Sequence, residues 1–145
     1  MTPDVNVLIA ASRSDHPHHR KAYAWLDEAL VACADGASLR LIPMVTASFL
    51  RLVTNPKIFI QPTPVADAVN FLDSLLAVPG VDMPHLGSEW PLFRQLCMNK
   101  KLSANDIPDA WLAAVVIQLG EHLVTFDTDF KKLLGRMQVT VLVAD

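Results

Sequence analysis

The stretch SANDIPDAWLAA at residues 103–114 shows most clearly how this chain is built. Asp106 and Asp109 open a run of small and apolar residues that ends at Gly120. Such a run predicts a buried helix with Pro108 in its first turn and the glycine just past its C-terminus. Asp106 suits the N-cap, and Asp109 at the third helical position would favour the helix dipole. Capping alone would account for both carboxylates, so any further role for Asp109 depends on which residues the fold brings beside it.

Strand and helix patterns alternate on both sides of this helix. Residues 5–9 form an apolar run that suits a buried strand or its exit into a helix. The other expected strands lie at 39–43, 79–84, 122–126 and 139–145, and the other expected helices at 16–34, 44–56, 63–77 and 88–100. This alternation predicts an α/β protein with a mostly parallel sheet. No repeat, low-complexity segment or linker interrupts the pattern, so residues 1–145 are expected to form a single domain.

Three tryptophans fall at helical core positions. Trp90 is expected on the inner face of the helix at 88–100, together with Phe93. Trp25 and Trp111 occupy similar positions in their own helices. The expected role of these rings is core packing or a dimer interface, and not stacking on nucleic-acid bases.

The composition excludes some classes of protein. Of the 145 residues, 52% are hydrophobic, which is enough to build a sizeable core and argues against disorder. The net charge of −3 lacks the basic surplus of a free-standing nucleic-acid binder, so any such contact must be local or assisted by a metal. The longest strongly apolar stretches are about ten residues, short of the roughly 20 needed to span a bilayer. No basic leader precedes VNVLIAA, so a cytoplasmic protein with no membrane contact is expected.

Carboxylates follow the ends of several predicted strands. Asp4 lies at the first strand, Asp127 directly follows HLVTF, and Asp109 lies in the first turn of its helix. Ligands of open parallel sheets bind outside the carboxyl ends of the strands, so these acids could converge at one edge. Like charges at such short range would repel unless a divalent cation lay between them, and oxygen-only ligands suit Mg²⁺ or Mn²⁺. The simpler alternative is that each aspartate merely caps a turn.

A cation held this way would favour metal-assisted hydrolysis of a phosphodiester. Asp4 is the hardest of the acids to explain structurally, because a charge beside a buried apolar run costs several kcal/mol unless it is paired or metal-bound. Asn6 could either orient Asp4 or bond to a turn of the backbone. Asp129 is expected to be the N-cap of a short helix that follows.

Four segments of the chain resemble the PIN-domain ribonucleases, and most of all the VapC toxins of type II toxin–antitoxin systems in their mycobacterial group. The segments are PDVNVLIAA, FLRLVTNP, DIPDAWLAAVVIQLG and LVTFDTDF, which occur in that order and at similar distances in the family. The resemblance covers nearly the whole chain. It implies a PIN-like three-layer sandwich with about five parallel strands and helices on both faces.

The resemblance also implies an activity and its partners. The family's acids fall on Asp4, Asp109 and Asp127, which would act as catalytic metal ligands, with Asp106 and Asp129 as possible auxiliary ligands. The implied activity is that of an endoribonuclease that requires Mg²⁺ or Mn²⁺ and cuts RNA of the tRNA or rRNA class. The implied partners are a second copy of the chain, forming a homodimer, and a VapB-type antitoxin that holds the enzyme inactive.

One position departs from the family pattern. Many members carry a glutamate where this chain has Ser48, in TASFLR. Its absence lowers the negative charge around the cation, so weaker metal binding or compensation by Asp106 or Asp129 is expected. Two alternatives therefore stay open: a catalytically weak or inactive module that binds RNA or an antitoxin, and a phosphohydrolase with a small substrate.

A few basic residues are candidates for RNA contact. Arg51, on the helix that contains FLRLV, could donate two hydrogen bonds to a phosphate or pair with a surface acid. Lys57, Arg13 and Lys100 are weaker candidates of the same kind. The histidines of DHPHHRK lack the spacing of a standard zinc site and are expected to form a solvated helix N-terminus.

Overall fold

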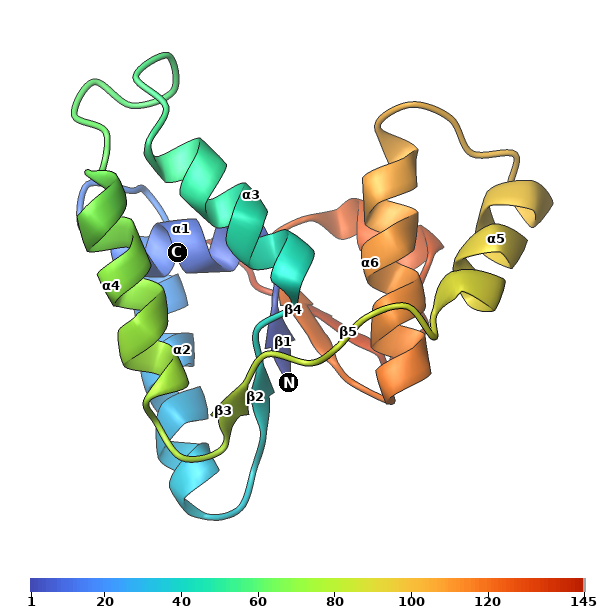
Figure 1. The fold of residues 1–145 in the computed structure, drawn as a ribbon, viewed down its shortest axis with the longest axis horizontal. Helices are drawn as coiled ribbons and strands as arrows, with labels where there is room; N and C mark the ends of the chain where they lie inside the picture. The colour runs from blue at the N-terminus through green and yellow to red at the C-terminus, as the bar shows by residue number, and fades with distance from the viewer. Residues whose placement is uncertain (145) are drawn as a thin grey trace.

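The computed structural model describes residues 1–144, and short parallel strands run through its centre (Figure 1). The strands are β1 (Thr2–Pro3), β2 (Leu39–Arg40), β3 (Val81–Asp82), β4 (Leu123–Thr125) and β5 (Val139–Val141). β1, β4 and β5 form one sheet in the order β1-β4-β5, and β2 pairs with β3; all three strand pairs are parallel. Asp145, at the end of the predicted last strand, lies outside the described residues.

The two sheets meet at β1 and β2. The backbone N–H of Arg40 donates to the carbonyl of Met1 at 2.9 Å, and the Thr2 hydroxyl donates to the carbonyl of Arg40 at 2.7 Å. The strands therefore follow one another in the order β3-β2-β1-β4-β5. Because each strand has only two or three residues, the regular ladder is interrupted between β2 and β1, where the sequence predicts one continuous sheet.

Helices flank the strands on two sides. The helices are α1 (Val5–Ser12), α2 (His19–Ala34), α3 (Pro43–Val53), α4 (Val65–Leu76), α5 (Trp90–Asn99) and α6 (Asp106–Leu119), with a short 3₁₀ helix, η1, at Thr128–Lys132. In Figure 1, α1 to α4 gather on the left of the strands, and α5 and α6 lie on the right. The predicted α/β sandwich is confirmed. No helix within residues 1–144 combines the length and the apolar character needed to cross a membrane.

The apolar run near the start is a helix and not a strand. β1 ends at Pro3, Asp4 precedes the first turn, and α1 runs from Val5 to Ser12. The side chains of Val7 to Ala11 are all buried in α1. Such a continuously apolar segment fits a fully buried helix as well as a buried strand, so its periodicity could not decide between the two.

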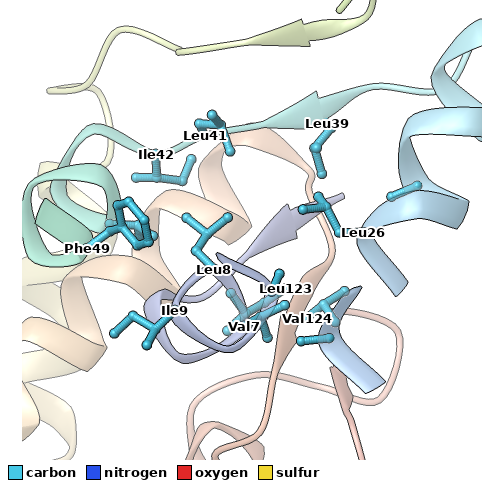
Figure 2. Packing of buried hydrophobic residues seen from close by; sticks show 14 of the residues in the cluster. Val7, Leu8, Ile9, Leu26, Leu39, Leu41, Ile42, Phe49, Leu123 and Val124 are labelled. Carbon is cyan, nitrogen blue, oxygen red and sulfur yellow. The ribbon is translucent and has the colours of Figure 1, made fainter. Parts of the chain in front are cut away.

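The core forms around α1. Figure 2 shows Leu8 of α1 between Phe49 of α3 and Leu39 of β2, with Leu123 of β4 close by. Leu8, Leu39, Phe49 and Leu123 are each fully buried. Because α1 is held against the sheet on one side and helices on the other, the residue at its N-terminus is fixed in position.

Helix α6 is buried and ends at Gly120, as its sequence predicts, but its N-terminus differs from the prediction. Gly120 ends it in the left-handed conformation at φ +64°, and Ala110, Ala113 and Ala114 are fully buried. The predicted N-cap was wrong: Asp106 is the first helical residue, Asn105 precedes it, and no side chain caps this end. The carboxylate of Asp106 is therefore exposed and free of any capping role.

Helix α5 lies further outside than its pattern indicated. It packs along α6, and none of its residues is buried. Trp90 is 62% exposed, so its predicted place in the core was wrong. The main neighbour of α5 is α6, and part of the aromatic surface of α5 stays open.

Candidate active site

Asp4 lies between β1 and α1, and its carboxylate is almost completely buried. Oδ1 accepts a hydrogen bond from the Val5 backbone N–H at 2.7 Å, and Oδ2 accepts one from the Thr125 hydroxyl at 2.7 Å. Burial raises the pKa of Asp4, these two hydrogen bonds oppose the rise, and the negative charge of Asp127 adds to it. Within residues 1–144, the group is thus a buried carboxylate with hydrogen-bonded partners but no cation in an ion pair with it.

Thr125 connects Asp4 to the end of β4. Its hydroxyl oxygen accepts hydrogen bonds from the Asn6 side-chain amide at 3.2 Å and from the Asp127 backbone N–H at 3.0 Å. The other end of the Asn6 amide accepts from the Phe126 backbone N–H at 3.2 Å. Asn6 therefore does both of the things that the sequence allowed, since it bonds the turn after β4 and steadies the hydroxyl that holds Asp4.

Asp127 follows β4 and begins η1. Its Oδ1 accepts from the Asp129 backbone N–H at 2.8 Å, so Asp127 is the N-cap of this helix. The prediction that Asp129 is the cap was wrong by two residues. Asp129 is exposed, and one of its oxygens lies 3.6 Å from the Lys132 ammonium in a solvated ion pair.

Asp109 lies in the first turn of α6 and is half-buried. Burial raises the pKa of its carboxyl to about 6, and the charges of Asp127 and Asp4 add most to that effect. Asp106 and Asp129 contribute smaller repulsions of the same sign. The acids that the sequence singled out are therefore within electrostatic reach of Asp109, although they come from three separate segments.

Two grooves lie beside Asp109. The first, of about 410 Å³, lies between α3 and α6, and we call it the α3–α6 groove. It is lined by Asp4, Val5, Met44, Val45, Ser48, Arg51, Leu52, Phe93, Ile107, Pro108, Asp109, Trp111 and Leu112. The second, of about 450 Å³, is the lysine groove, lined by Lys100, Leu102, Asp106, Asp109, Asp129, Lys132 and Leu133. Asp109 is the lining residue that the two grooves share, so it borders both of them.

The donor set fits a hard divalent cation. The oxygen-bearing side chains that line the grooves with Asp109 are the carboxylates of Asp4, Asp106 and Asp129 and the Ser48 hydroxyl, and Mg²⁺ and Mn²⁺ prefer such ligands. The cations Arg51, Lys100 and Lys132 line the same grooves. Repulsion already raises the pKa of Asp109, and a cation would relieve it. Within residues 1–144, no three His, Cys, Asp or Glu side chains are close enough together to hold a metal as they stand. The carboxylates would have to turn toward an ion as it binds.

The candidate RNA contacts separate into different environments. Arg51 is exposed and lines the α3–α6 groove near Asp4 and Asp109. Lys57 is exposed in the loop after α3 and lines neither groove, whereas Lys100 lines the lysine groove.

Arg13 has a structural role, and the expectation that it contacts RNA was wrong. Its side chain is buried and forms a bidentate pair with Asp15 at 2.7 and 3.0 Å. The remaining bonds go to the Thr63 hydroxyl at 3.0 Å and the Gln61 carbonyl at 2.9 Å, and the guanidinium lies 3.9 Å above the Phe59 ring. Its donors hold the loop before α4, so they are not available to a phosphate.

An aromatic wall of the α3–α6 groove was not foreseen from the sequence. Trp111 and Phe93 line this groove, and Trp111 is 38% exposed. The indole N–H of Trp111 donates to the Glu89 carboxylate at 2.8 Å, and Glu89 also accepts from the Gly87 backbone N–H at 2.7 Å. The helical spacing placed both rings inward, but it held no signal for Glu89, which is buried at the start of α5.

The family model that describes the PIN domain matches residues 1–134. The chain belongs to the PIN-domain family. Its similarity to the VapC branch of PIN domains is also confirmed. It is 41% identical to ribonuclease VapC25 and 40% identical to ribonuclease VapC31, both of Mycobacterium tuberculosis, over 89% of this chain and 89% of each relative. Ribonuclease VapC43 of the same organism is 38% identical, over 89% of this chain and 86% of its own.

A solved structure supports the PIN fold independently. The crystal structure of VapBC2 from Rickettsia felis bound to a promoter DNA fragment contains a chain with the same fold at a TM-score of 0.64. The match covers 97% of this chain and 96% of the other at 15% identity. At that identity the likeness establishes the PIN fold and nothing finer.

Proposed function

We propose that this PIN domain is an endoribonuclease toxin that requires Mg²⁺ or Mn²⁺. The observation that carries the proposal is the electrostatic convergence on Asp109, whose pKa is raised to about 6 by burial and by the charges of Asp127 and Asp4. A group of acids that repel one another beside two open grooves is costly without a cation. We expect such a group of acids where a bound cation takes part in a reaction.

The acids and their neighbours would divide the work. Asp4, Asp109 and Asp127 would hold the cation, with Asp106 and Asp129 as auxiliary carboxylates at the lysine groove. Once bound there, the cation would polarise a phosphoryl oxygen and lower the pKa of a water molecule. Thr125 would keep the Asp4 carboxylate oriented, as its 2.7 Å hydrogen bond does now.

Arg51 would contact a phosphate of the RNA from the side of α3. Its guanidinium is exposed in the groove that also contains Asp4 and Asp109, and such contacts position a strand without reading its sequence. Water would be the attacking nucleophile, so the RNA 2′-hydroxyl is not required. The products are therefore expected to carry 5′-phosphate and 3′-hydroxyl ends.

The partners follow from the family. We propose that a VapB-type antitoxin neutralises the enzyme, because the matched Rickettsia felis structure is a VapBC complex. We also propose that the chain acts as a single domain over residues 1–145, as a homodimer, in the cytoplasm where tRNA and rRNA are present. The names of its M. tuberculosis relatives support the ribonuclease assignment.

The decisive experiment is cleavage of purified tRNA and rRNA by the isolated protein. Cleavage should require Mg²⁺ or Mn²⁺, stop with a chelator and return when the metal is restored. Asp4→Asn should abolish cleavage without unfolding the protein, because the amide has the shape of the carboxylate and its oxygen can still accept from the Val5 N–H. Asp73→Asn, the same change at an exposed position on α4, is the matched control and should cleave normally. Products with 2′,3′-cyclic phosphate ends would rule out the proposed mechanism.

A binding module without activity is the second candidate, and Ser48 favours it. This residue lines the α3–α6 groove where many family members have a glutamate, so the site has one carboxylate fewer. Metal-independent RNA binding with no cleavage of any tested RNA would support this candidate. Turnover of simple phosphate esters would instead indicate a small-substrate phosphohydrolase.

A further inference from the structure

The aromatic wall of the α3–α6 groove continues directly from the carboxylates. Trp111 lines the groove together with Asp4, Asp109 and Arg51, and it belongs to the same helix as Asp109. A strand of RNA whose phosphate reached the acids would therefore place a neighbouring nucleotide against this wall. The net charge of the protein is negative, so the affinity for such a nucleotide must come from local contacts of this kind.

The Trp111 ring is held in a fixed orientation. Its indole N–H donates to Glu89, and that carboxylate is 5% exposed and is bonded also by the Gly87 backbone. Burial alone would raise the pKa of Glu89, but the hydrogen bonds from Trp111 and Gly87 hold it below its usual value, so the carboxylate stays charged. The Phe93 ring meets the indole edge-on, with centroids 6.3 Å apart and planes at 87°. An aromatic ring fixed on two sides loses little conformational entropy when a ligand stacks on it.

The chemistry of the wall suits an unpaired nucleobase. The polar atom of the indole is already bonded to Glu89, so the exposed 38% of Trp111 offers apolar surface and no hydrogen-bond donor. Stacking on aromatic side chains is the usual way in which proteins hold single-stranded bases, and it accepts any base. Arg51 in the same groove supplies a positive charge for the phosphate that the base carries.

Building on the proposed ribonuclease function, we propose that Trp111, supported by Glu89 and Phe93, stacks on an unpaired base next to the phosphodiester that is cut. The substrate class is accordingly a single-stranded segment, such as a loop, and not a continuous duplex. A base held in a duplex could not turn toward the ring without first unpairing. Trp111 is thus a specificity-determining residue, and Glu89 is a positioning residue that acts through it.

A protein partner is the competing occupant of this wall. A second copy of the chain that filled the α3–α6 groove over Trp111 would also cover Arg51 and Asp109, because all three line this groove, and it would close the path of the RNA. The nucleobase is therefore favoured for the active enzyme. A protein on this wall remains an outcome that the test below can reveal.

The test uses two fluorescein-labelled RNA probes in Ca²⁺, which replaces Mg²⁺ so that binding is measured without cleavage. One probe is a ten-nucleotide oligoadenylate, and the other is the same oligomer with its four central bases removed. The wild-type protein should prefer the first by about fivefold or more, the range expected for one stacked base. Trp111→Leu should lose this preference, bind both probes as wild type binds the abasic one, and keep the circular dichroism spectrum of a folded protein. Trp111→Phe should keep most of it.

Tyr23→Leu is the matched control, because Tyr23 is a 56% exposed aromatic residue on α2 that lines neither the α3–α6 groove nor the lysine groove. It should retain the full preference for the oligoadenylate. Equal binding of both probes by wild type would overturn the proposal, and so would a preference that survives Trp111→Leu. A change in sedimentation mass on Trp111→Leu, with the preference intact, would assign the wall to a second copy instead.

A second measurement does not depend on the folding of the leucine variant. In the Trp25→Phe, Trp90→Phe double variant, Trp111 is the remaining tryptophan, and its fluorescence reports on the surroundings of this ring. The oligoadenylate should quench it strongly and the abasic probe weakly; equal quenching, or none, would overturn the stacking. Cleavage of RNA in Mg²⁺ is scored separately. Base-dependent binding without cleavage would refute the proposed function and leave the stacking standing, whereas cleavage without base-dependent binding would refute the stacking alone.

Discussion

The hydroxyl of Thr125 donates a 2.7 Å hydrogen bond to Oδ2 of Asp4, and the two residues are 121 positions apart in the sequence. Both residues are buried, and the same hydroxyl accepts from Asn6 and from the Asp127 backbone. One hydroxyl therefore ties together the ends of β1 and β4, which are neighbouring parallel strands. This contact fixes the position of Asp4 relative to Asp127.

Replacement of Thr125 by valine should destabilise the protein and weaken its metal site. Valine keeps the shape but leaves the buried Asp4 carboxylate and the Asp127 N–H without their partner, at a cost of about 1–3 kcal/mol. Urea unfolding should show this loss, and the affinity for Mn²⁺ should fall by about 10–100-fold. Thr125→Ser keeps the hydroxyl and should bind metal nearly as wild type does. Equal losses of metal affinity in the two variants would contradict this role.

The stability of the metal-free protein should depend on the ionisation of Asp109. Its pKa is about 6 in the folded state, against an ordinary value of 3.8, so folding favours its protonated form. This contribution therefore makes the protein more stable as the pH falls from 7.5 through 6 toward 4. The melting temperature of Asp109→Asn should be higher than that of wild type at pH 7.5, and the difference should shrink at pH 5.

His16 provides the internal control for this pH dependence. Burial lowers the pKa of its imidazole, so the positive charge that it acquires at acidic pH opposes folding, and this effect is present in both proteins. Only the difference between wild type and Asp109→Asn therefore reports on the carboxyl. A difference that stays constant between pH 5 and pH 7.5 would show that Asp109 is not strained by its neighbours.

Ser48→Glu should tighten metal binding. The residue lines the same groove as Asp4 and Asp109, so a carboxylate there adds negative charge near the proposed cation. Isothermal titration with Mn²⁺ should show a lower Kd than for wild type. Ser48→Gln adds the same bulk without the charge and should leave the Kd near the wild-type value. An unchanged affinity in Ser48→Glu would mean that this position is too far from the ion.

Arg51→Gln should weaken RNA binding to a similar extent for every sequence. A phosphate contact releases counterions, so the slope of log affinity against log salt should become shallower by about 0.7 for single-stranded RNA. Lys57→Gln changes an exposed cation that lines neither groove and should have a smaller effect. A loss of affinity that differed between RNA sequences would instead indicate a base contact.

Arg13→Lys should reduce stability without affecting RNA binding. Lysine cannot reproduce the bidentate pair with Asp15 together with the bonds to Thr63 and Gln61, which should cost about 1–3 kcal/mol in urea unfolding. Its positive charge is retained, so the salt dependence of RNA affinity should match that of wild type. A shallower salt dependence would restore Arg13 as a phosphate contact.

Much of the fold could be predicted from local patterns. The helix at α6 and its stop at Gly120 followed from helical spacing and a C-terminal glycine, and both are present. The predicted start of η1 was wrong because two nearby aspartates suit an N-cap equally well. Asp127 and Asp129 can each cap η1, and only the path of β4 decides which one does. The prediction that Trp90 lies in the core was wrong, because an apolar stripe on a helix does not reveal how much of it the neighbouring elements will cover.

The acids of the candidate site could be predicted from the sequence, but the residues that hold the site in place could not. Asp4, Asp109 and Asp127 each stand at a strand end or a helix start, positions that the topology of a parallel sheet brings together. The buried hydroxyl of Thr125 and the Glu89–Trp111 pair carry no comparable pattern, since each is defined by a partner at long range. Arg13 shows the opposite error, because a cation that seemed free in the sequence is neutralised inside the fold.

Local patterns along the chain were enough to predict which chemical groups line the site and the order in which the strands and helices follow. Those properties depend on neighbours along the chain, through capping, spacing and burial of apolar stripes. Which groups act together became visible in the folded protein: burial and neighbouring charges raise the pKa of Asp109, Thr125 donates to Asp4, and Asp109 and Trp111 line one groove. Electrostatic repulsion and hydrogen bonding depend on distances of a few ångströms in space, and sequence separation does not record them.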